Sequence, residues 1–361
     1  MRILVTGASG FIGRYLSSYA AGLGHEVTGT YLTPPELSSR ILTDGRIRWK
    51  QLDIRDGRAV RRMVETLRPQ AVFHLAAQAY AKKAWADPID TFQTNVLGTI
   101  HLYEALRRSP PGEGVLLTAS AAAYGIPPSL PVREEAPLWA TNPYGVSKAS
   151  QEAISYQYHL NFGLRIVRAR LFGTTGPGKT GDALNDFARQ VARLERTEGP
   201  AVLKVGNLEP RRDISDIRDS VRGLWKVFEA GDPKQPINVG AGQSYSVRSI
   251  VEQLVALSKV PLSVETDPNL LRPTDELDNA SDTHRLEALG YRREYPLERT
   301  IRESLDFWRA EADQTSAPTP RPRRVARGRR PTRSPPRSRS SRPSRPSRRP
   351  ARTSGGVRRR R

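Results

Sequence analysis

A tyrosine and a lysine four residues apart are the side chains in this sequence best suited to do chemistry together. Tyr144 and Lys148 stand in the segment NPYGVSKAS, and this spacing places both on one face of a helix, one turn apart. A phenol has an ordinary pKa of about 10. A nearby ammonium, together with a positively charged cofactor ring, stabilises the phenolate and brings that pKa towards the working range. The pair predicts a tyrosine that acts as general acid or base, although such pairs are also common on helix surfaces.

A serine upstream favours the catalytic interpretation. Ser120 lies 24 residues before Tyr144 in the segment LLTASAAAYG, where an apolar run predicts the end of a strand. A hydroxyl at that place can hydrogen-bond the substrate oxygen that the tyrosine protonates. We therefore predict that Ser120, Tyr144 and Lys148 are the catalytic residues.

Three glycines near the start of the chain form a second candidate site. The segment ILVTGASGFIG places an apolar strand before Gly7, Gly10 and Gly13, and a helix follows. In this context Gly7 suits a tight turn, Gly10 lets the backbone approach a pyrophosphate, and Gly13 lets the helix pack closely on the strand. The N-terminus of the helix adds unpaired N–H groups and a partial positive charge. The segment predicts a dinucleotide cofactor site that includes Gly7, Ser9, Gly10, Phe11, Ile12 and Gly13.

The hydrophobic pattern indicates which elements position these sites. Short apolar runs alternate with amphipathic stretches, which implies right-handed βαβ crossovers. The predicted fold class is α/β, a Rossmann-like, doubly wound parallel sheet covered by helices on both faces. The predicted strands lie at Ile3–Thr6, Glu26–Thr30, Arg48–Leu52, Ala71–Leu75, Val115–Thr118, Arg165–Leu171 and Ile237–Val239.

The alternation breaks after Phe172, where mostly loops and helices are expected. We predict a dinucleotide-binding domain from residues 1–172 and about 213–242, and a smaller substrate-binding lobe from about 173–212 and 243–312. Residues 313–361 are rich in arginine, proline and serine and have almost nothing to bury. A disordered tail is therefore expected there.

Most of the positive charge lies in this tail. The formal net charge is +21, and residues 314–361 contain 18 arginines and no Asp, Glu or Lys, which leaves about 21 − 18 = +3 for the rest of the chain. Such a tail binds nucleic acid only weakly and without sequence choice. A cofactor-sensing or nucleic-acid-binding module is the non-enzymatic alternative, and the complete set of catalytic residues argues against it.

Composition excludes several other classes of site. The chain has no cysteine and only five histidines, which excludes disulfides and thiol nucleophiles, and no metal site is predicted. Met1 and Arg2 lead directly into the first apolar run, so no signal peptide is expected. No apolar run approaches the roughly 20 residues of a membrane span. A cytoplasmic enzyme with no membrane partner is the expectation.

Together these motifs resemble the extended short-chain dehydrogenases/reductases, the group of nucleotide-sugar epimerases, dehydratases and reductases, over about residues 1–310. The resemblance implies that Tyr144 is the general acid or base and that Lys148 holds the nicotinamide ribose. It also implies a homodimer that pairs through the helices containing Asn95 and Tyr144. For Asn95, an internal helix-to-strand hydrogen bond is an equally good alternative to a direct role. Further cofactor contacts are implied at Asp53 and Ile54 in QLDIRD, at Leu75, Ala76, Ala77 and Gln78 in HLAAQ, and at Asn95.

The choice of cofactor depends on the end of the second strand. The acidic residue that binds a ribose 2′-hydroxyl in this fold is missing, because VTGTYLTP offers only Thr30, Tyr31 and Thr33. This favours NADP(H) over NAD(H). Arg14 and Arg40 are candidates to meet a 2′-phosphate, although either can equally be an ordinary surface arginine.

Three alanines narrow the type of reaction. Sugar 4,6-dehydratases of the group carry an extra carboxylate between the hydroxyl residue and the YG dipeptide, and here those positions are Ala121, Ala122 and Ala123. Alanine cannot exchange a proton, so dehydration is disfavoured. Ketone reduction and 4-epimerisation remain, since both need only the three catalytic residues.

The second half of the chain resembles enzymes of GDP-mannose-derived sugars, nearest to the subgroup of GDP-4-keto-6-deoxymannose reductases. This resemblance implies that Arg212 and Arg272 clamp the substrate pyrophosphate and that Asp275 takes the ribose hydroxyls. Where the group has Asn-His before TGPG, this chain has Gly173-Thr174, and a substrate contact is lost. The expected reaction is NADPH-dependent reduction at C4 of a GDP-4-keto-6-deoxyhexose to a sugar of the GDP-rhamnose type. An NAD-dependent nucleotide-sugar 4-epimerase is the alternative, and a 4,6-dehydratase is a weaker one.

Overall fold

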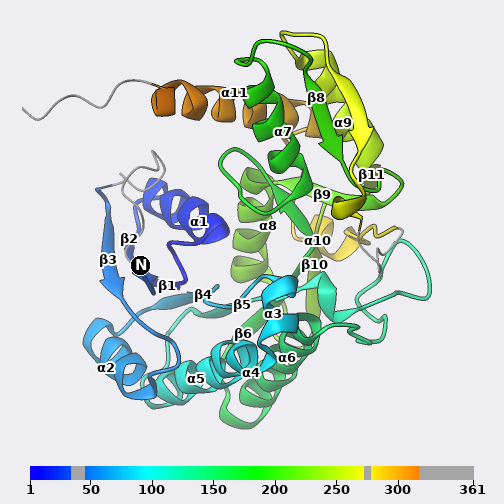
Figure 1. Cartoon of the computed structure of the whole chain (residues 1–361). Coiled ribbons are helices and arrows are strands. Elements are labelled where there is room, and N and C mark those ends of the chain that lie inside the picture. The colour runs from blue at the N-terminus through cyan, green and yellow to red at the C-terminus, as the bar shows by residue number, and fades with distance from the viewer. Residues whose placement is uncertain (34–44, 272–277, 317–361) are drawn as a thin grey trace, which may run out of the picture. The chain divides into compact units, whose positions relative to one another are not determined.

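A seven-stranded parallel sheet forms the centre of the computed structural model, which describes residues 1–33, 45–271 and 278–316. Its strands are β1 Arg2–Thr6, β2 Glu26–Tyr31, β3 Ile47–Gln51, β4 Ala71–His74, β5 Gly114–Ser120, β6 Ile166–Leu171 and β10 Pro236–Val239. They lie in the order β10-β6-β5-β4-β1-β2-β3, so the direction of winding reverses between β1 and β4 (Figure 1). Each strand coincides with a predicted run and differs from it only at the ends. The predicted Rossmann-like, doubly wound sheet is confirmed.

Helices cover both faces of this sheet (Figure 1). Alternate residues of a strand point to opposite faces. On β1, Ile3 and Val5 belong to the core cluster under α1 and α8, whereas Leu4 belongs to the cluster under α2, α5 and α6. Strands buried on both faces appear in the sequence as continuous apolar runs. The covering helices are α1 Phe11–Gly22, α8 Ile217–Ala230, α2 Gly57–Leu67, α5 Gly98–Arg108 and α6 Pro143–Phe162.

A second hydrophobic core lies in the part of the chain that follows β6. Helices α7 Ala183–Leu194, α9 Val247–Leu257 and α11 Leu297–Ser316 enclose it. Five short strands accompany these helices, and the prediction of mostly loops and helices missed them. They form two small sheets, one from β7 Gly173–Thr175, β9 Arg211–Asp216 and β11 Ser244–Ser246, the other from β8 Val202–Val205 and β12 Ser263–Thr266.

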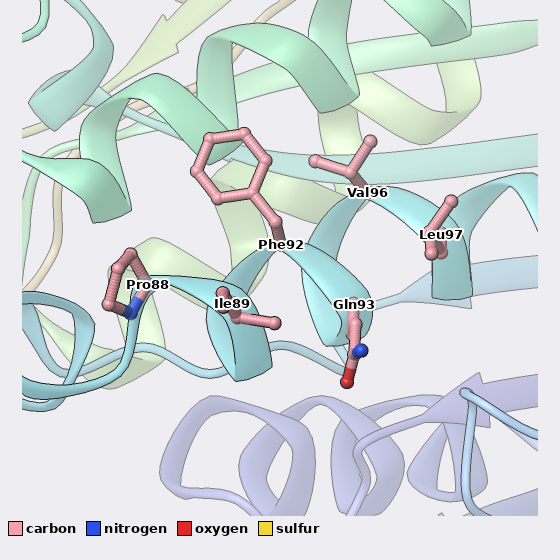
Figure 2. A pocket seen from close by; sticks show the side chains of 6 residues that line it. All are labelled: Pro88, Ile89, Phe92, Gln93, Val96 and Leu97. Carbon is pink, nitrogen blue, oxygen red and sulfur yellow. The ribbon is translucent and has the colours of Figure 1, made fainter.

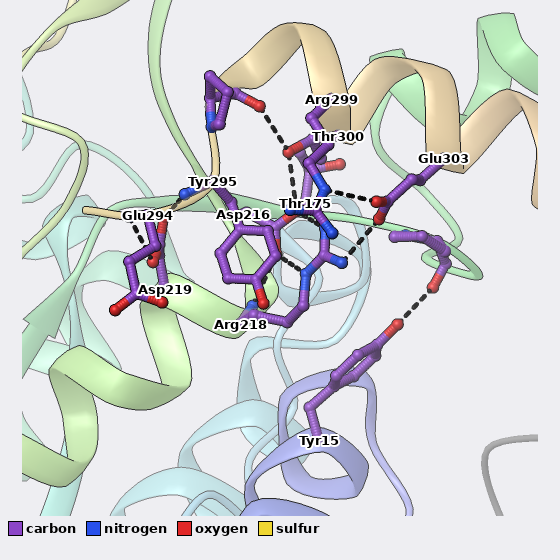
Figure 3. A network of polar contacts seen from close by, with 12 residues as sticks. Tyr15, Thr175, Asp216, Arg218, Asp219, Glu294, Tyr295, Arg299, Thr300 and Glu303 are labelled. Carbon is purple, nitrogen blue, oxygen red and sulfur yellow. Dashed lines mark hydrogen bonds and ion pairs between the residues drawn. The ribbon is translucent and has the colours of Figure 1, made fainter.

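A polar network joins the second core to the helices of the central sheet (Figure 3). Arg218, near the start of α8, forms ion pairs of 2.7 Å with Asp216 and with Glu303 of α11. Its guanidinium lies 3.8 Å from the centroid of the Tyr295 ring. The hydroxyl of Thr300 also donates to the Asp216 carboxylate, at 2.7 Å. The buried carboxylate therefore has the partners that it needs, and α11 is fixed against the N-terminus of α8.

Residues Met1–Ala317 form one compact unit, and the boundary between the two predicted lobes within it stays a prediction. Helix α11 continues past the predicted domain end at residue 312, while the rest of the predicted tail, residues 317–361, lies outside the described residues. No helix in the described ranges combines the length and the apolar character that crossing a membrane requires. The remaining described elements are short. They are α3 Ala81–Ala86, α4 Pro88–Phe92, η2 Gln93–Leu97, η3 Ala121–Ala123, η4 Pro268–Leu270 and α10 His284–Ala288.

Candidate active site

The three glycines between β1 and α1 form a cradle made of backbone. Gly7 has a φ of +71°, and a β-carbon there would lie 2.7 Å from the amide nitrogen of Ala76. A β-carbon on Gly13 would lie 2.3 Å from the carbonyl oxygen of Gly7, so only glycine lets α1 approach the turn this closely. Gly10 is the N-cap of α1 and would meet only the Gly7 oxygen, at 3.2 Å. This cradle fits the diphosphate of a dinucleotide.

The end of β2 supports this turn. The N–H of Gly7 donates to the hydroxyl oxygen of Thr30 at 3.1 Å, and Thr30 is buried. The sequence names Thr30 only among the non-acidic residues at the end of the second strand, and its contact with the turn was missed. No local sequence signal predicts this contact, because the two residues are 23 positions apart.

Replacing Gly13 with alanine is expected to weaken cofactor binding by at least about tenfold and to lower the melting temperature, because overpacking at a backbone contact costs about 1–3 kcal/mol. Fluorescence titration with NADPH and thermal unfolding measure both effects. Gly22→Ala is the matched control, since it lies on the same helix and its β-carbon would meet nothing within 4 Å. Unchanged affinity in Gly13→Ala would remove the cradle from the cofactor site.

Ser120 and Tyr144 come together where β5 ends and α6 begins. Asn142 caps α6 by accepting from the N–H of Gly145 at 2.9 Å. A β-carbon on Gly145 would lie 2.3 Å from the carbonyl oxygen of Ala122, so glycine is needed for the helix to start this close to the strand. Burial raises the pKa of the Tyr144 phenol, and a hydrogen bond with Ser120 opposes this shift. The acidification predicted from sequence depends also on the positive ring of the cofactor, so it stays a prediction.

Lys148 lies one turn after Tyr144 and is almost completely buried, with 4% of its surface exposed. Its Nζ donates to the carbonyl oxygen of Thr118 at 2.7 Å and to Oε1 of Gln151 at 2.9 Å. Burial lowers the pKa of the ammonium to about 7. Gln151 was missed from sequence, although its i, i+3 spacing from Lys148 places the two on one helix face.

The loop after β4 is fixed by Asn95. Asn95 is fully buried in η2, and its Oδ1 accepts from the N–H of Gln78 at 2.7 Å. Its Nδ2 donates to the carbonyl of Gln78 at 3.1 Å and to the hydroxyl of Ser147 at 2.8 Å. The sequence left an internal helix-to-strand hydrogen bond as the alternative, and the internal bonds observed join η2 to the loop after β4 and to α6. Asn95 thus positions Gln78, and with it the segment Leu75, Ala76 and Ala77, relative to α6.

Asp53 and Ile54 lie in different surroundings. The carboxylate of Asp53 pairs with Arg55 at 2.7 Å, and Arg55 also pairs with Asp90 at 2.7 Å. Ile54 is buried in the core beneath α5. Its side chain lies so close to Gly98 that a β-carbon on this glycine would be 2.7 Å away. Asp53 is thus the one of the two whose side chain is partly exposed and can contact a cofactor.

The predicted substrate residues are only partly within the described residues. Arg212 lies on β9, pairs in register with Tyr245 of β11, and donates to the carbonyl of Arg211 at 2.8 Å. Arg272 and Asp275 lie outside the described residues, as does Arg40. Arg14 lies on α1, next to the cradle, and burial lowers the pKa of its guanidinium.

The unusual Gly173-Thr174 pair has a structural reason. A β-carbon on Gly173 would lie 2.3 Å from the carbonyl oxygen of Asp213, so asparagine does not fit there without a backbone shift. The hydroxyl of Thr174 lies 2.9 Å from that of Ser220. The loop that follows is tied to α1, because the Tyr15 hydroxyl donates to a carbonyl oxygen of this loop at 3.1 Å (Figure 3).

Residues 4–304 match the family model described as GDP-mannose 4,6 dehydratase. The GDP-6-deoxy-D-mannose reductase of Pseudomonas aeruginosa is 30% identical over 313 residues, which covers 85% of this chain and 97% of the relative. The UDP-glucose 4-epimerase of Lacticaseibacillus casei is 26% identical over 313 residues, covering 82% and 92%.

Solved structures show the same two kinds of neighbour. RMD from Pseudomonas aeruginosa complexed with NADPH has a TM-score of 0.73 and 29% identity, and the match covers 86% of this chain and 99% of that one. The UDP-glucose 4-epimerase of Thermus thermophilus in complex with NAD has a TM-score of 0.74 and 26% identity, with coverage of 86% and 99%.

Proposed function

Because the chain belongs to the GDP-mannose 4,6 dehydratase family of extended short-chain dehydrogenases/reductases, we propose that it reduces the C4 ketone of a GDP-4-keto-6-deoxyhexose with NADPH. The product is a GDP-deoxyhexose of the GDP-rhamnose type. As a member of this family, the chain is an NAD(P)-dependent nucleotide-sugar enzyme. The observation that carries the finer proposal is the contact of the Ser120 and Tyr144 hydroxyls beside three alanines.

Each catalytic residue has a separate task in this reaction. The nicotinamide cofactor, when bound, supplies the hydride for the ketone carbon. Ser120 orients the ketone oxygen by donating a hydrogen bond to it, and Tyr144 gives that oxygen a proton as negative charge develops there. Because burial raises the pKa of the phenol, Tyr144 keeps its proton at neutral pH, which suits a group that must donate it. Lys148 holds the ribose with the ammonium hydrogen that Thr118 and Gln151 leave available.

The alanines of η3 support reduction over dehydration. Ala122 lies directly against the start of α6, since its carbonyl oxygen would be 2.3 Å from a β-carbon on Gly145. A carboxylate at Ala121, Ala122 or Ala123 would therefore stand beside the catalytic helix. Methyl groups at these positions supply no proton for the loss of water.

Consumption of cofactor distinguishes the reductase from a nucleotide-sugar 4-epimerase. The 4-epimerase is the second candidate because epimerases are among the relatives and the structural neighbours. With GDP-4-keto-6-deoxymannose, the proposed reductase oxidises one NADPH per product formed. An epimerase returns the hydride and shows no net loss of absorbance at the nicotinamide band. Turnover of a nucleotide sugar without NADPH loss would therefore replace the proposed function with the epimerase.

NADPH is the proposed cofactor in preference to NADH. The end of β2 offers Thr30 and Tyr31 and no acidic residue to bind a ribose 2′-hydroxyl, and the Thr30 hydroxyl is engaged by Gly7. Arg14 on α1 is the described candidate for the 2′-phosphate. The reductase neighbour that was solved with NADPH supports this choice. The same assay run with NADH measures the preference directly.

An apolar surface on α4 and η2 supports a homodimer. A groove of about 400 Å³ is lined by Pro88, Ile89, Phe92, Gln93, Val96 and Leu97 (Figure 2). Ile89 is 70% exposed and Leu97 of η2 is 49% exposed, and α4 packs against α6. Exposed apolar patches of this kind mark interfaces between proteins. We propose that two copies of the chain pair through this surface.

The double variant Ile89→Glu with Leu97→Glu is expected to be monomeric, because it places two charges in the apolar groove of the proposed interface. Light scattering coupled to size-exclusion chromatography measures the mass. Leu23→Glu, which changes an exposed leucine at the end of α1, is the control and keeps the wild-type mass. A double variant with the mass of a dimer contradicts this interface.

A further inference from the structure

We propose that Gln151 is a positioning residue, which orients the ammonium of Lys148 and ties it to the strand that carries the glycine turn. This proposal rests on the proposed function, in which Lys148 holds the cofactor ribose. Gln151 is itself 1% exposed, so its contacts are made inside the protein and do not depend on solvent.

The ammonium of Lys148 has three hydrogens, and two of them have fixed acceptors. The carbonyl oxygen of Thr118 belongs to β5, and Oε1 of Gln151 belongs to α6. One hydrogen remains for the ribose or the phenol. The ionisable groups around this ammonium are Tyr144, one turn earlier on α6, and His74 on β4, whose pKa the Lys148 charge helps to lower. Gln151 is therefore the side chain that fixes the direction of the remaining hydrogen.

Thr99 of α5 fixes which way the Gln151 amide points. The hydroxyl of Thr99 donates to the carbonyl of Asn95 at 2.5 Å, so its oxygen can only accept from other groups. Nε2 of Gln151 donates to this oxygen at 2.7 Å. The opposite end of the amide, Oε1, must then face Lys148.

His74 continues the chain of hydrogen bonds into β1. Burial is the main cause that lowers its pKa to about 3, so the ring is neutral. Its Nε2 lies 2.9 Å from the Thr99 hydroxyl, which already donates to Asn95, so Nε2 carries the ring hydrogen. Nδ1 then accepts from the hydroxyl of Thr6 at 2.7 Å. Thr6 directly precedes Gly7, so this series of bonds connects the lysine to the cofactor cradle.

Two substitutions of Gln151 test this role through the pH dependence of kcat/KM. Gln151→Glu places a carboxylate against the ammonium, which raises the pKa of Lys148. The high-pH limb of the kcat/KM profile then moves to higher pH by about one pH unit. Gln151→Met keeps the size of the side chain and removes the acceptor. It is expected to lower kcat/KM at pH 7 by about tenfold, and to move the same limb downward. Activity is lost as pH rises through the pKa of Lys148, so the two shifts have opposite signs.

Tyr103→Phe is the matched control. Its hydroxyl lies 2.7 Å from that of Ser155 and joins the same two helices, α5 and α6, away from Lys148. Its pH profile should equal that of the wild type. The proposal is overturned if both Gln151 variants keep the wild-type limb, or if they lose activity and melting temperature together while the limb stays in place. Should Gln151→Met not fold, Thr99→Val, which removes the acceptor for the Gln151 amide, replaces it and is expected to move the limb downward as well.

The affinity for NADPH separates failure of this proposal from failure of the proposed function. A wild-type chain that binds NADPH but does not reduce the keto-sugar contradicts only the reaction, and the pH dependence of NADPH binding then tests Gln151 by the same opposite shifts. A chain that binds neither NADPH nor NAD overturns both.

Discussion

Replacing Tyr144 with phenylalanine is expected to lower kcat/KM for the keto-sugar by about a thousandfold, the usual range for loss of a positioned proton donor. The affinity for NADPH should stay within about twofold of the wild type, because the variant keeps the glycine cradle and Lys148. The ring also keeps its place at the start of α6, so the helix cap by Asn142 is retained. Steady-state kinetics and fluorescence titration measure the two quantities.

Tyr158→Phe provides the control for this result. Tyr158 lies on the same helix, is buried, and its hydroxyl donates to Glu104 at 2.8 Å instead of facing Ser120. Removal of the Tyr158 hydroxyl should leave kcat/KM unchanged. If Tyr144→Phe retained a rate within tenfold of the wild type, the phenol would not be the proton donor and another group would have to be sought.

The central sheet could be predicted because most of its strands are buried on both faces. The run Ile3–Val5 is apolar throughout, and its residues enter two different cores. Not all strands of the second region have this signal, since β11 is only half-buried along its length. All residues of β12 are exposed. Such strands form because their neighbours offer an edge to pair with, and a local hydrophobic pattern does not record that.

The site could be predicted where a residue type is itself the requirement. Gly7 and Gly13 are such cases, because a β-carbon at either would collide with backbone. The surroundings of Tyr144 and Lys148 could not be predicted in the same way. The Lys148 ammonium is engaged by Thr118 and Gln151, and burial raises the pKa of the phenol. Burial and main-chain acceptors depend on contacts between distant segments, which spacing alone cannot reveal.

A buried ion pair holds the catalytic helix against the sheet. Glu152 lies one turn after Lys148 on α6, and its carboxylate receives two hydrogen bonds from Nε and Nη2 of Arg170 on β6, at 2.9 and 2.5 Å. The two side chains are only 5% and 6% exposed. Nη1 of Arg170 also donates to the Tyr124 hydroxyl and to the carbonyl of Glu134, both at 2.7 Å. The guanidinium is thus paired on all sides.

Glu152→Ala is therefore expected to reduce the free energy of unfolding by about 3–5 kcal/mol, because it leaves the Arg170 charge buried without its counter-ion. Denaturant unfolding measures this loss. The double variant Glu152→Met with Arg170→Met removes both charges and should recover most of it, so the two substitutions are strongly non-additive. Additive losses would mean that the pair does not interact in the folded state. Since Glu152 follows Lys148 on the same helix, the single variant should also lower kcat/KM, and the double variant should restore it in parallel with stability.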